Sequence, residues 1–307
     1  MKYLLNGLAV QSEVALNAPL TVEKPNLVVT VAEISKDQAD DRQGEVMAEL
    51  TLQDQRRYTA WRTADGGSVL RVHGLCDFEV NQSASTVYCV PTAECKGEYL
   101  AILLGGLVIS FILTLKRRCV LHGSAVAFDS RALGFVGASG GGKSTLAVQM
   151  CLEGGALVTD DVLPLATSAD GVVIVGRASE LRLRSGASEF VERLAAGASV
   201  RSTADNRLAV APRGARSEQS RLHAIVLPRP FKGITALRCE QLTPTRALFE
   251  LARHLRVAVC DSDLLCAQFE QLSEVVARVA VFSVDVPWGP PFQPEVPRQL
   301  LLQLGLA

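Results

Sequence analysis

The chain has 307 residues, of which 48% are hydrophobic, and its formal net charge is −1. This composition is that of a globular protein, and the length suits one large domain or two ordinary ones with a sizeable core. Because the charge is close to zero, a dedicated nucleic-acid-binding protein is disfavoured, and we expect no nucleic-acid partner.

Cysteine usage and the N-terminus indicate the compartment. The 8 cysteines form no CxxC pair and no metal-ligand spacing, and several lie in apolar stretches. We therefore expect buried thiols in a reducing environment. The first ten residues lack the long apolar core of a secretory signal, so we expect a cytoplasmic protein.

The first part of the chain alternates short apolar runs with clusters of Asn, Asp, Gly and Ser, a pattern that predicts strands. The predicted strands are residues 4–10, 27–31, 46–52, 68–72 and 86–90. We therefore expect a small β-rich N-terminal domain over residues 1–96 and a second domain over residues 97–307.

Residues 100–115 form an uncharged apolar run that is followed by Lys116, Arg117 and Arg118. The run is shorter than the roughly twenty residues that a spanning helix needs, and a pair of glycines interrupts it. We expect a buried helix of the second domain and no membrane partner.

Two further apolar runs, residues 119–128 and 132–136, predict a hairpin that leads into a glycine-rich loop. After the loop, residues 144–153 predict a helix that ends at Gly154-Gly155. The loop fits the pattern GxxxxGK[ST], and its sequence is Gly137-Ala138-Ser139-Gly140-Gly141-Gly142-Lys143-Ser144-Thr145.

Each part of this loop has a role toward a bound polyphosphate. The glycines let successive backbone N–H groups converge on phosphate oxygens, and the N-terminus of the following helix attracts the same anion. Lys143 would reach the β- and γ-phosphates, and the Ser144 hydroxyl would help to hold Mg²⁺. We therefore predict that residues 137–145 bind ATP together with Mg²⁺.

Three other polar residues are candidates for the chemistry. Residues 156–159 predict a short strand that ends at Asp160 and Asp161, so that one carboxylate could bind Mg²⁺ while the other faces an acceptor hydroxyl. The pair also fits a surface turn. His122, on the predicted strand before the loop, also fits a satisfied core side chain.

The remaining predicted elements follow in order. Residues 172–175 and 222–227 predict strands, and Thr243-Pro244 opens a helix that extends to about residue 255. Residues 262–278 predict another helix, and residues 280–286 predict a strand. A proline-rich connection then leads to a last helix that ends near residue 304, with Gly305 as its stop.

The segment from His122 to Asp161 resembles the catalytic core of the HPr kinase/phosphorylase family, whose pattern is HG, then GxSGxGKS, then LxxDD. Here these elements are His122-Gly123, the glycine loop and Leu157-Val-Thr-Asp160-Asp161. Lys143 lies 21 residues after His122, and the acidic pair begins 17 residues after Lys143.

This resemblance implies an α/β fold, namely a P-loop kinase domain of the HPr kinase/PEP carboxykinase-like type, preceded by the small β-rich domain. It also implies roles: Asp160 as the base toward a serine hydroxyl, Asp161 at the metal with Ser144, and His122 as a neighbour that helps to order the site. Related kinases are commonly assemblies, so a homo-oligomer is one implied state.

One position departs from the family pattern. The family has a later glutamate in an LExRG segment, and the nearest match here, residues 181–186, has Arg182 at that place, with Glu180 one strand position off. The departure argues against phosphorylase activity. An arginine there could contact a phosphate or a carboxylate.

The overall layout is similar to HPr-kinase-related proteins of ribosomal peptide pathways, including lasso-peptide kinases. That similarity implies transfer of the γ-phosphoryl group to the C-terminal serine of a precursor peptide. The alternatives are a kinase of a small protein or of a small-molecule hydroxyl, a carboxykinase, and a nucleotide-sensing module without catalysis. An ABC-type or motor ATPase is disfavoured because no LSGGQ-like segment follows.

The first prediction concerns nucleotide binding. Lys143→Ala removes the ammonium that would reach the phosphates, so we expect ATP to bind at least about tenfold more weakly. Isothermal titration calorimetry measures this, with Lys116→Ala as a control outside the loop. Unchanged ATP affinity of Lys143→Ala would contradict the assignment.

Overall fold

The computed structural model describes the whole chain except residues 35–37, 39–43, 96, 177, 179, 184–189, 191, 192, 194–199, 212–218, 288, 290, 291 and 307. The chain forms two compact units, the first of Met1–Arg118 with Arg256–Gln268 and the second of Cys119–Leu255 with Phe269–Ala307. The division after residue 118 differs from the sequence-based boundary at residue 96, because the apolar helical segment belongs to the first unit.

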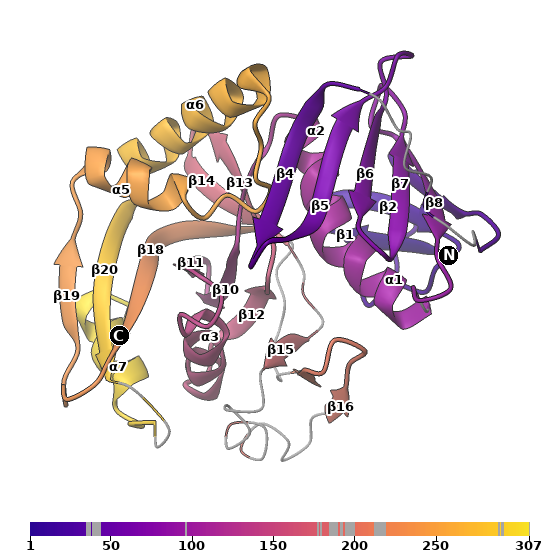
Figure 1. Cartoon of the computed structure of the whole chain (residues 1–307). Helices are drawn as coiled ribbons and strands as arrows, with labels where there is room; N and C mark the ends of the chain where they lie inside the picture. Colours follow the sequence, from indigo (N-terminus) through magenta and orange to yellow (C-terminus); the bar gives the residue numbers. More distant parts are fainter. Residues whose placement is uncertain are drawn as a thin grey trace. The chain divides into compact units, whose positions relative to one another are not determined.

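The first unit is built around an eight-stranded sheet (Figure 1). Its strand order is β1-β2-β3-β8-β7-β6-β5-β4. The strands are β1 (Lys2–Leu5), β2 (Leu8–Ser12), β3 (Leu27–Val31), β4 (Val46–Leu52), β5 (Gln55–Arg62), β6 (Ser68–Val72), β7 (Cys76–Val80) and β8 (Thr86–Pro91).

The predictions for β3, β4 and β6 are confirmed at both ends, but the single strand predicted over residues 4–10 is wrong. Asn6 and Gly7 have φ angles of 51° and 75°, which form a tight turn between β1 and β2. Leu5 and Leu8 then face each other across an antiparallel pair. An Asn-Gly pair is a strong hairpin signal, and here it outweighs the apolar run around it.

The apolar segment forms one continuous helical stretch of α1 (Gly97–Leu103), η1 (Leu104–Val108) and α2 (Ile109–Leu115). By length and composition it could cross a membrane, but 61% of its most apolar window is buried in the protein. It is thus a buried helix, as predicted, but in the first unit. The wide turn at its glycines is supported by Ser110, whose hydroxyl donates to the Gly106 carbonyl at 2.7 Å.

Most cysteines are buried, as expected, but Cys260 and Cys266 are exposed, so the prediction is wrong for these two. They lie on or just before an amphipathic helix, whose outer face reaches solvent. Burial raises the pKa of the Cys119 thiol to about 12, which keeps that thiol protonated at neutral pH.

The second unit contains a nine-stranded sheet with a path of β12-β10-β11-β18-β14-β13-β9. Off this path, β20 pairs with β18, and β19 pairs with β20. A separate three-stranded sheet has the order β15-β17-β16. The elements before β16 are β9 (Cys119–Leu121), β10 (Gly123–Phe128), β11 (Arg131–Val136), α3 (Lys143–Leu152), β12 (Ala156–Thr159), β13 (Leu163–Ser168), β14 (Gly171–Val175) and β15 (Leu181–Leu183).

The later elements include three helices with signals that the sequence analysis identified. In chain order, these later elements are β16 (Val200–Ser202), β17 (Leu208–Val210), β18 (Gln219–Phe231), β19 (Arg238–Gln241), α5 (Pro244–Ala252), α6 (Ser262–Arg278), β20 (Ala280–Pro287) and α7 (Val296–Gln303). Thr243 caps α5 through its side chain, as predicted, although α5 ends three residues earlier than expected.

Helices cover both faces of the nine-stranded sheet, so the chain is mixed α/β (Figure 1). Because side chains alternate along a strand, neighbouring residues of β11 enter different cores. Leu133 and Phe135 pack with α3 and α7, whereas Ala132 and Val136 pack in the core that contains α5 and the end of α6. The helix that follows the glycine loop is thereby held against the sheet.

Helix α3 ends as the glycine pair predicted. Gly154 has a φ of 94°, and its N–H donates to the Cys151 carbonyl at 3.2 Å. The Gly155 N–H donates to the Met150 carbonyl at 3.0 Å. These two bonds form a Schellman motif, which satisfies carbonyls at the end of the helix.

The second prediction follows from the crowding at this turn. A Cβ on Gly155 would lie 2.4 Å from Val126 Cγ1 and 2.9 Å from the Met150 carbonyl, so Gly155→Ala should destabilise the protein by about 1–3 kcal/mol. Chemical denaturation measures the loss. Gly105→Ala, where a Cβ meets nothing within 4 Å, is the control and should lose no stability.

Candidate active site

Strand register brings the candidate residues together from distant parts of the chain. Strand β10 is antiparallel to both β11 and β12, with Gly123 opposite Val136 and Ala125 opposite Thr159. The beginning of β10 therefore adjoins the end of β11, which leads into the glycine loop, and the end of β12, which leads to the acidic pair. His122, Lys143 and Asp160 are separated by 21 and 17 residues in the chain, and this pairing brings them to one edge of the sheet.

Gly123 has a packing reason to be glycine. A Cβ there would lie 2.8 Å from the Phe135 carbonyl and 3.0 Å from Leu163 Cδ2. His122 lies between β9 and β10, not within a strand as expected, and its backbone N–H donates to the His254 carbonyl at 2.8 Å. The backbone on both sides of the histidine is therefore fixed.

The glycine loop has the conformation that an anion site needs. Gly140 and Gly142 have φ angles of 83° and 87°, which non-glycine residues rarely adopt. Gly142 is the N-cap of α3, and no side-chain cap hydrogen bond forms there. The N-terminus of a helix presents backbone N–H groups and a positive dipole end, which suit an anion. The Lys143 ammonium lies over the loop and donates to the Ala138 carbonyl at 2.9 Å.

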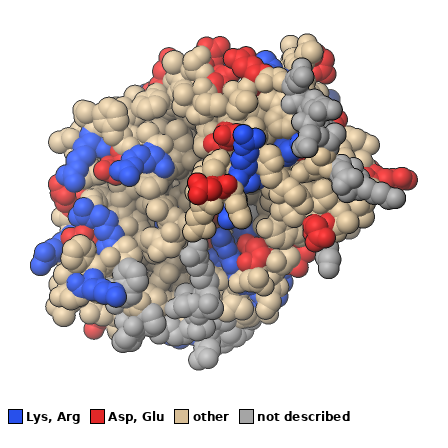
Figure 2. All heavy atoms as spheres, in the orientation of Figure 1, with Lys and Arg blue, Asp and Glu red and all other residues tan. Residues whose placement is uncertain are grey.

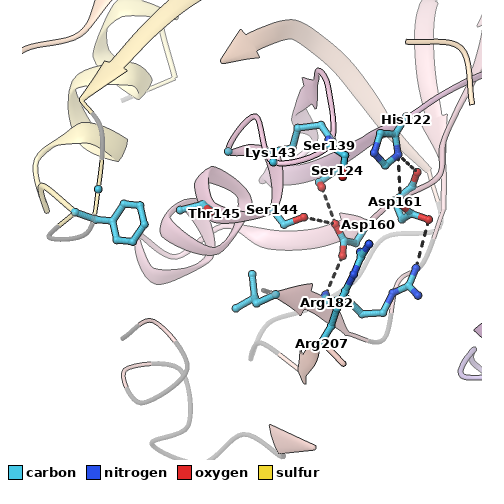
Figure 3. A pocket seen from close by; sticks show the side chains of 15 residues that line it. His122, Ser124, Ser139, Lys143, Ser144, Thr145, Asp160, Asp161, Arg182 and Arg207 are labelled. Carbon is cyan, nitrogen blue, oxygen red and sulfur yellow. Dashed lines mark hydrogen bonds and ion pairs between the residues drawn. The ribbon is translucent and has the colours of Figure 1, made fainter. Parts of the chain in front are cut away.

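A cavity of about 230 Å³ gathers nine of the predicted site residues (Figure 3). It lies beside the loop and the acidic pair, and it is also lined by Arg182 and Leu183 of β15 and by Arg207, which directly precedes β17. The predicted residues that line it are His122, Ser139, Gly140, Gly142, Lys143, Ser144, Thr145, Asp160 and Asp161. Gly137, Ala138 and Gly141 belong to the same loop but do not line this cavity.

Asp160 is held by three donors. Its Oδ1 accepts hydrogen bonds from the Ser124 hydroxyl at 2.6 Å and from the Ser144 hydroxyl at 3.1 Å. Its Oδ2 accepts from the backbone N–H of Arg182 at 2.9 Å (Figure 3). Of the two carboxylates, Asp160 is therefore the one beside the hydroxyl of the glycine loop.

Asp161 faces a different set of partners. Its backbone φ of 70° is unusual for a residue with a side chain. Its Oδ1 lies 3.3 Å from His122 Nδ1, and its Oδ2 lies 3.3 Å from Arg182 Nη2. The two carboxylates thus point in different directions, as the sequence predicted.

Arg182 occupies the position where the family pattern has a glutamate. Its Nη1 lies 3.6 Å from Asp205 Oδ2, and Arg207 Nε lies 3.4 Å from the same oxygen. Burial lowers the pKa of Arg182, but the attraction of Asp161, Asp160 and Asp205 outweighs it, so the pKa is raised. The guanidinium therefore stays charged in the cavity.

Sequence reasoning missed three polar residues of this site. Ser124 follows the His122-Gly123 pair directly and could have been noticed as a hydroxyl beside it. Asp205 and Arg207 lie near β17 and carry no local signal, because only the pairing of β15 with β17 brings them to the acidic pair. Glu180, the other candidate for the later glutamate, pairs with Arg201 at 2.8 Å and does not line the cavity.

A second cavity of about 130 Å³ adjoins the glycine loop and shares Gly140, Gly142, Thr145, Gly289 and Phe292 with the first. Its other walls are mainly apolar, with two amide side chains. They include Gln149, Pro228, Pro230, Val286 and Gln293. A flat heterocycle would fit between such walls.

The donor set fits Mg²⁺ only in part. The Ser144 hydroxyl and the Asp160 carboxylate are oxygen ligands of the kind that Mg²⁺ prefers, and they already lie 3.1 Å apart. Within the described part of the chain, no group of three or more His, Cys, Asp and Glu side chains could hold a metal ion. Phosphate and water oxygens would have to complete the coordination.

Charges on the molecular surface are mixed. On the face drawn in Figure 2, basic and acidic side chains are interspersed, and neither sign forms a continuous patch among the described residues. The lack of a nucleic-acid partner remains a prediction.

Comparison with known proteins leaves the family undetermined. No protein-family model and no curated protein matches the chain. Among solved structures, the chain is similar to the HPr(Ser) kinase/phosphatase from Coxiella burnetii, with 14% sequence identity, over 61% of this chain and 92% of that chain. The TM-score is 0.28. So low a similarity says nothing about the reaction, which has to be inferred from the site itself.

The third prediction concerns the histidine behind the site. Burial, together with Lys143, Arg253 and His122, lowers the pKa of His254 below its usual 6.5. The unfolded chain therefore takes up a proton before the folded chain does, and stability falls as the pH drops below about 6.5. Thermal unfolding at pH 7.5 and 5.5 should show a smaller drop for His254→Gln than for the wild type. An equal drop would contradict this.

Proposed function

We propose that this protein is an ATP- and Mg²⁺-dependent phosphotransferase with a hydroxyl group as acceptor. The observation that carries the proposal is the hydrogen bond of 3.1 Å between Ser144 in the glycine loop and Asp160, with a second carboxylate in the same cavity. A phosphate cradle, a metal-binding pair and a further carboxylate are the parts that phosphoryl transfer needs.

The nucleotide phosphates would bind at the glycine loop. The open N-terminus of α3 and the left-handed glycines Gly140 and Gly142 direct backbone N–H groups at an anion. Lys143 would exchange its hydrogen bond to the Ala138 carbonyl for one to a phosphate oxygen. The second cavity would take the base, with Gln149 and Gln293 as partners for its polar edge.

The metal would bind at Ser144 and Asp160, where it would neutralise the charge of the β- and γ-phosphates. The sequence-based assignment gave this role to Asp161 and made Asp160 the base. The direct bond between Ser144 and Asp160 favours exchanging the two roles.

Asp161 is then the carboxylate available to the acceptor. Its Oδ1 lies 3.3 Å from His122 Nδ1, which orients the carboxylate. As the acceptor oxygen attacks the γ-phosphorus, Asp161 takes the hydroxyl proton, the bond between the γ-phosphorus and the bridging oxygen breaks, and ADP leaves.

The identity of the acceptor rests on the sequence resemblance. We propose the serine hydroxyl of a peptide, in particular the C-terminal serine of a lasso-type precursor peptide. A small protein and a small-molecule hydroxyl are the variants. A cytoplasmic location, a possible homo-oligomer and the absence of a membrane partner belong to the same proposal.

A nucleotide-sensing module is the second candidate, and one observation favours it. Arg182 and His122 both hold the carboxylate of Asp161, which would leave a poor base if they stayed in place after ATP binding. Such a module would bind ATP and phosphorylate no acceptor.

The fourth prediction separates the two carboxylates. Asp161→Asn should keep ATP affinity within about threefold and lower the transfer rate by at least about a hundredfold, the usual contribution of a general base. Asp160→Asn should weaken Mg²⁺-dependent ATP binding. Mass spectrometry of peptides ending in serine, incubated with protein and ATP, measures transfer, and calorimetry measures binding.

Matched peptides that end in alanine are the control for the acceptor. Full transfer by Asp161→Asn would return the role of base to Asp160. No phosphorylation of any serine peptide by a wild-type protein that binds ATP would favour the nucleotide-sensing module.

A further inference from the structure

The protein already holds the acidic pair. Asp160 Oδ1 accepts from two hydroxyls, and Asp160 Oδ2 accepts from a backbone N–H. Asp161 Oδ2 lies beside the guanidinium of Arg182, and His122 Nδ1 lies 3.3 Å from Asp161 Oδ1 and 3.2 Å from the Asp161 carbonyl oxygen. Arg182 supplies two of these contacts, one from its backbone and one from its side chain.

Arg182 is fixed at this position. Arg182 lies in β15 opposite Ala209 of β17, and its backbone N–H donates to Asp160 Oδ2. Asp205 holds the far side of the guanidinium at 3.6 Å, and only 15% of the side chain is exposed. Asp161 and Asp205 therefore hold the guanidinium in the cavity from two sides.

We infer that Arg182 is a resident counter-ion that keeps the acidic pair from binding a divalent cation until nucleotide phosphates arrive. A cation at Ser144 and Asp160 would meet the fixed positive charge of Arg182 nearby, and the described residues include no group of three or more His, Cys, Asp and Glu side chains that could complete its coordination. Phosphate oxygens supply both the missing ligands and compensating negative charge. Metal and nucleotide therefore bind as a unit.

This inference deepens the proposed function, because it concerns the metal of the same site and the order in which it binds. It makes Arg182 a positioning residue that acts through Asp161. Arg207 provides a close comparison, since it lines the same cavity and pairs with the same Asp205 oxygen, but no contact between Arg207 and the acidic pair is described.

The test measures binding of Mn²⁺ alone to the full chain, without nucleotide, by electron paramagnetic resonance of the free ion. Arg182→Gln should bind one Mn²⁺ at least about tenfold more tightly than the wild type, because the fixed positive charge is gone. Arg182→Lys keeps a charge and should stay near the wild type. Arg207→Gln should also stay near the wild type.

A double variant locates the new metal site. Adding Asp160→Asn to Arg182→Gln should return Mn²⁺ affinity to the wild-type value or below, because Asp160 is the carboxylate beside Ser144. Circular dichroism checks that each variant folds, and Arg182→Lys provides the comparison if Arg182→Gln does not. If Arg182→Gln does not fold, the wild type is also tested with and without ATP. The inference is overturned if the wild type binds Mn²⁺ as tightly without ATP as with it.

Other outcomes are equally decisive. Unchanged Mn²⁺ affinity in a folded Arg182→Gln would overturn the inference, as would an equal gain in Arg207→Gln, which would indicate a general charge effect. Phosphoryl transfer is not needed for this measurement. A gained Mn²⁺ site without any phosphorylated acceptor would support the inference and reject the proposed kinase. A phosphorylated acceptor without a gained Mn²⁺ site would support the kinase and reject the inference.

Discussion

The antiparallel pairing of β10 with β11 and β12 is the constraint on which the candidate site depends. It sets the entry to the glycine loop, His122 and the acidic pair at one edge of the nine-stranded sheet. A slip of one residue in either register would turn Ser124 to the other face and separate it from Asp160. Gly123 allows the strands to approach closely enough for this register, because there is no room for a Cβ.

Charge balance is the second organising feature of the cavity. Lys143, Arg182 and Arg207 are the cations that line it, and Asp160, Asp161 and Asp205 are the carboxylates that contact its arginines or its hydroxyls. Charges removed from water are costly unless they are paired, so each carboxylate has specific donors. Binding of a polyphosphate and a metal would have to rearrange these ion pairs. The chemistry of the site would therefore depend on which of the ion pairs break.

Local signals predicted much of the fold. Helix α6 was predicted at both of its ends, and the Schellman turn after α3 and the cap of α5 follow from glycine, threonine and proline at fixed positions. Strands β5 and β7 were missed because charged residues interrupt their apolar pattern. In β7 the charge of Asp77 is buried against Arg71 at 2.9 Å, a contact that forms only when β6 and β7 pair as a hairpin.

By itself, the sequence determined the glycine loop, the helix that follows it and the residues of the acidic pair, because these depend on backbone chemistry within a few neighbouring positions. The tertiary structure decided that Ser144 contacts Asp160 and not Asp161, and that Arg182 holds Asp161. It also brought Asp205 and Arg207 to the site. These contacts join strands far apart in the chain, so they exist only once β10 pairs with β12 and β15 pairs with β17.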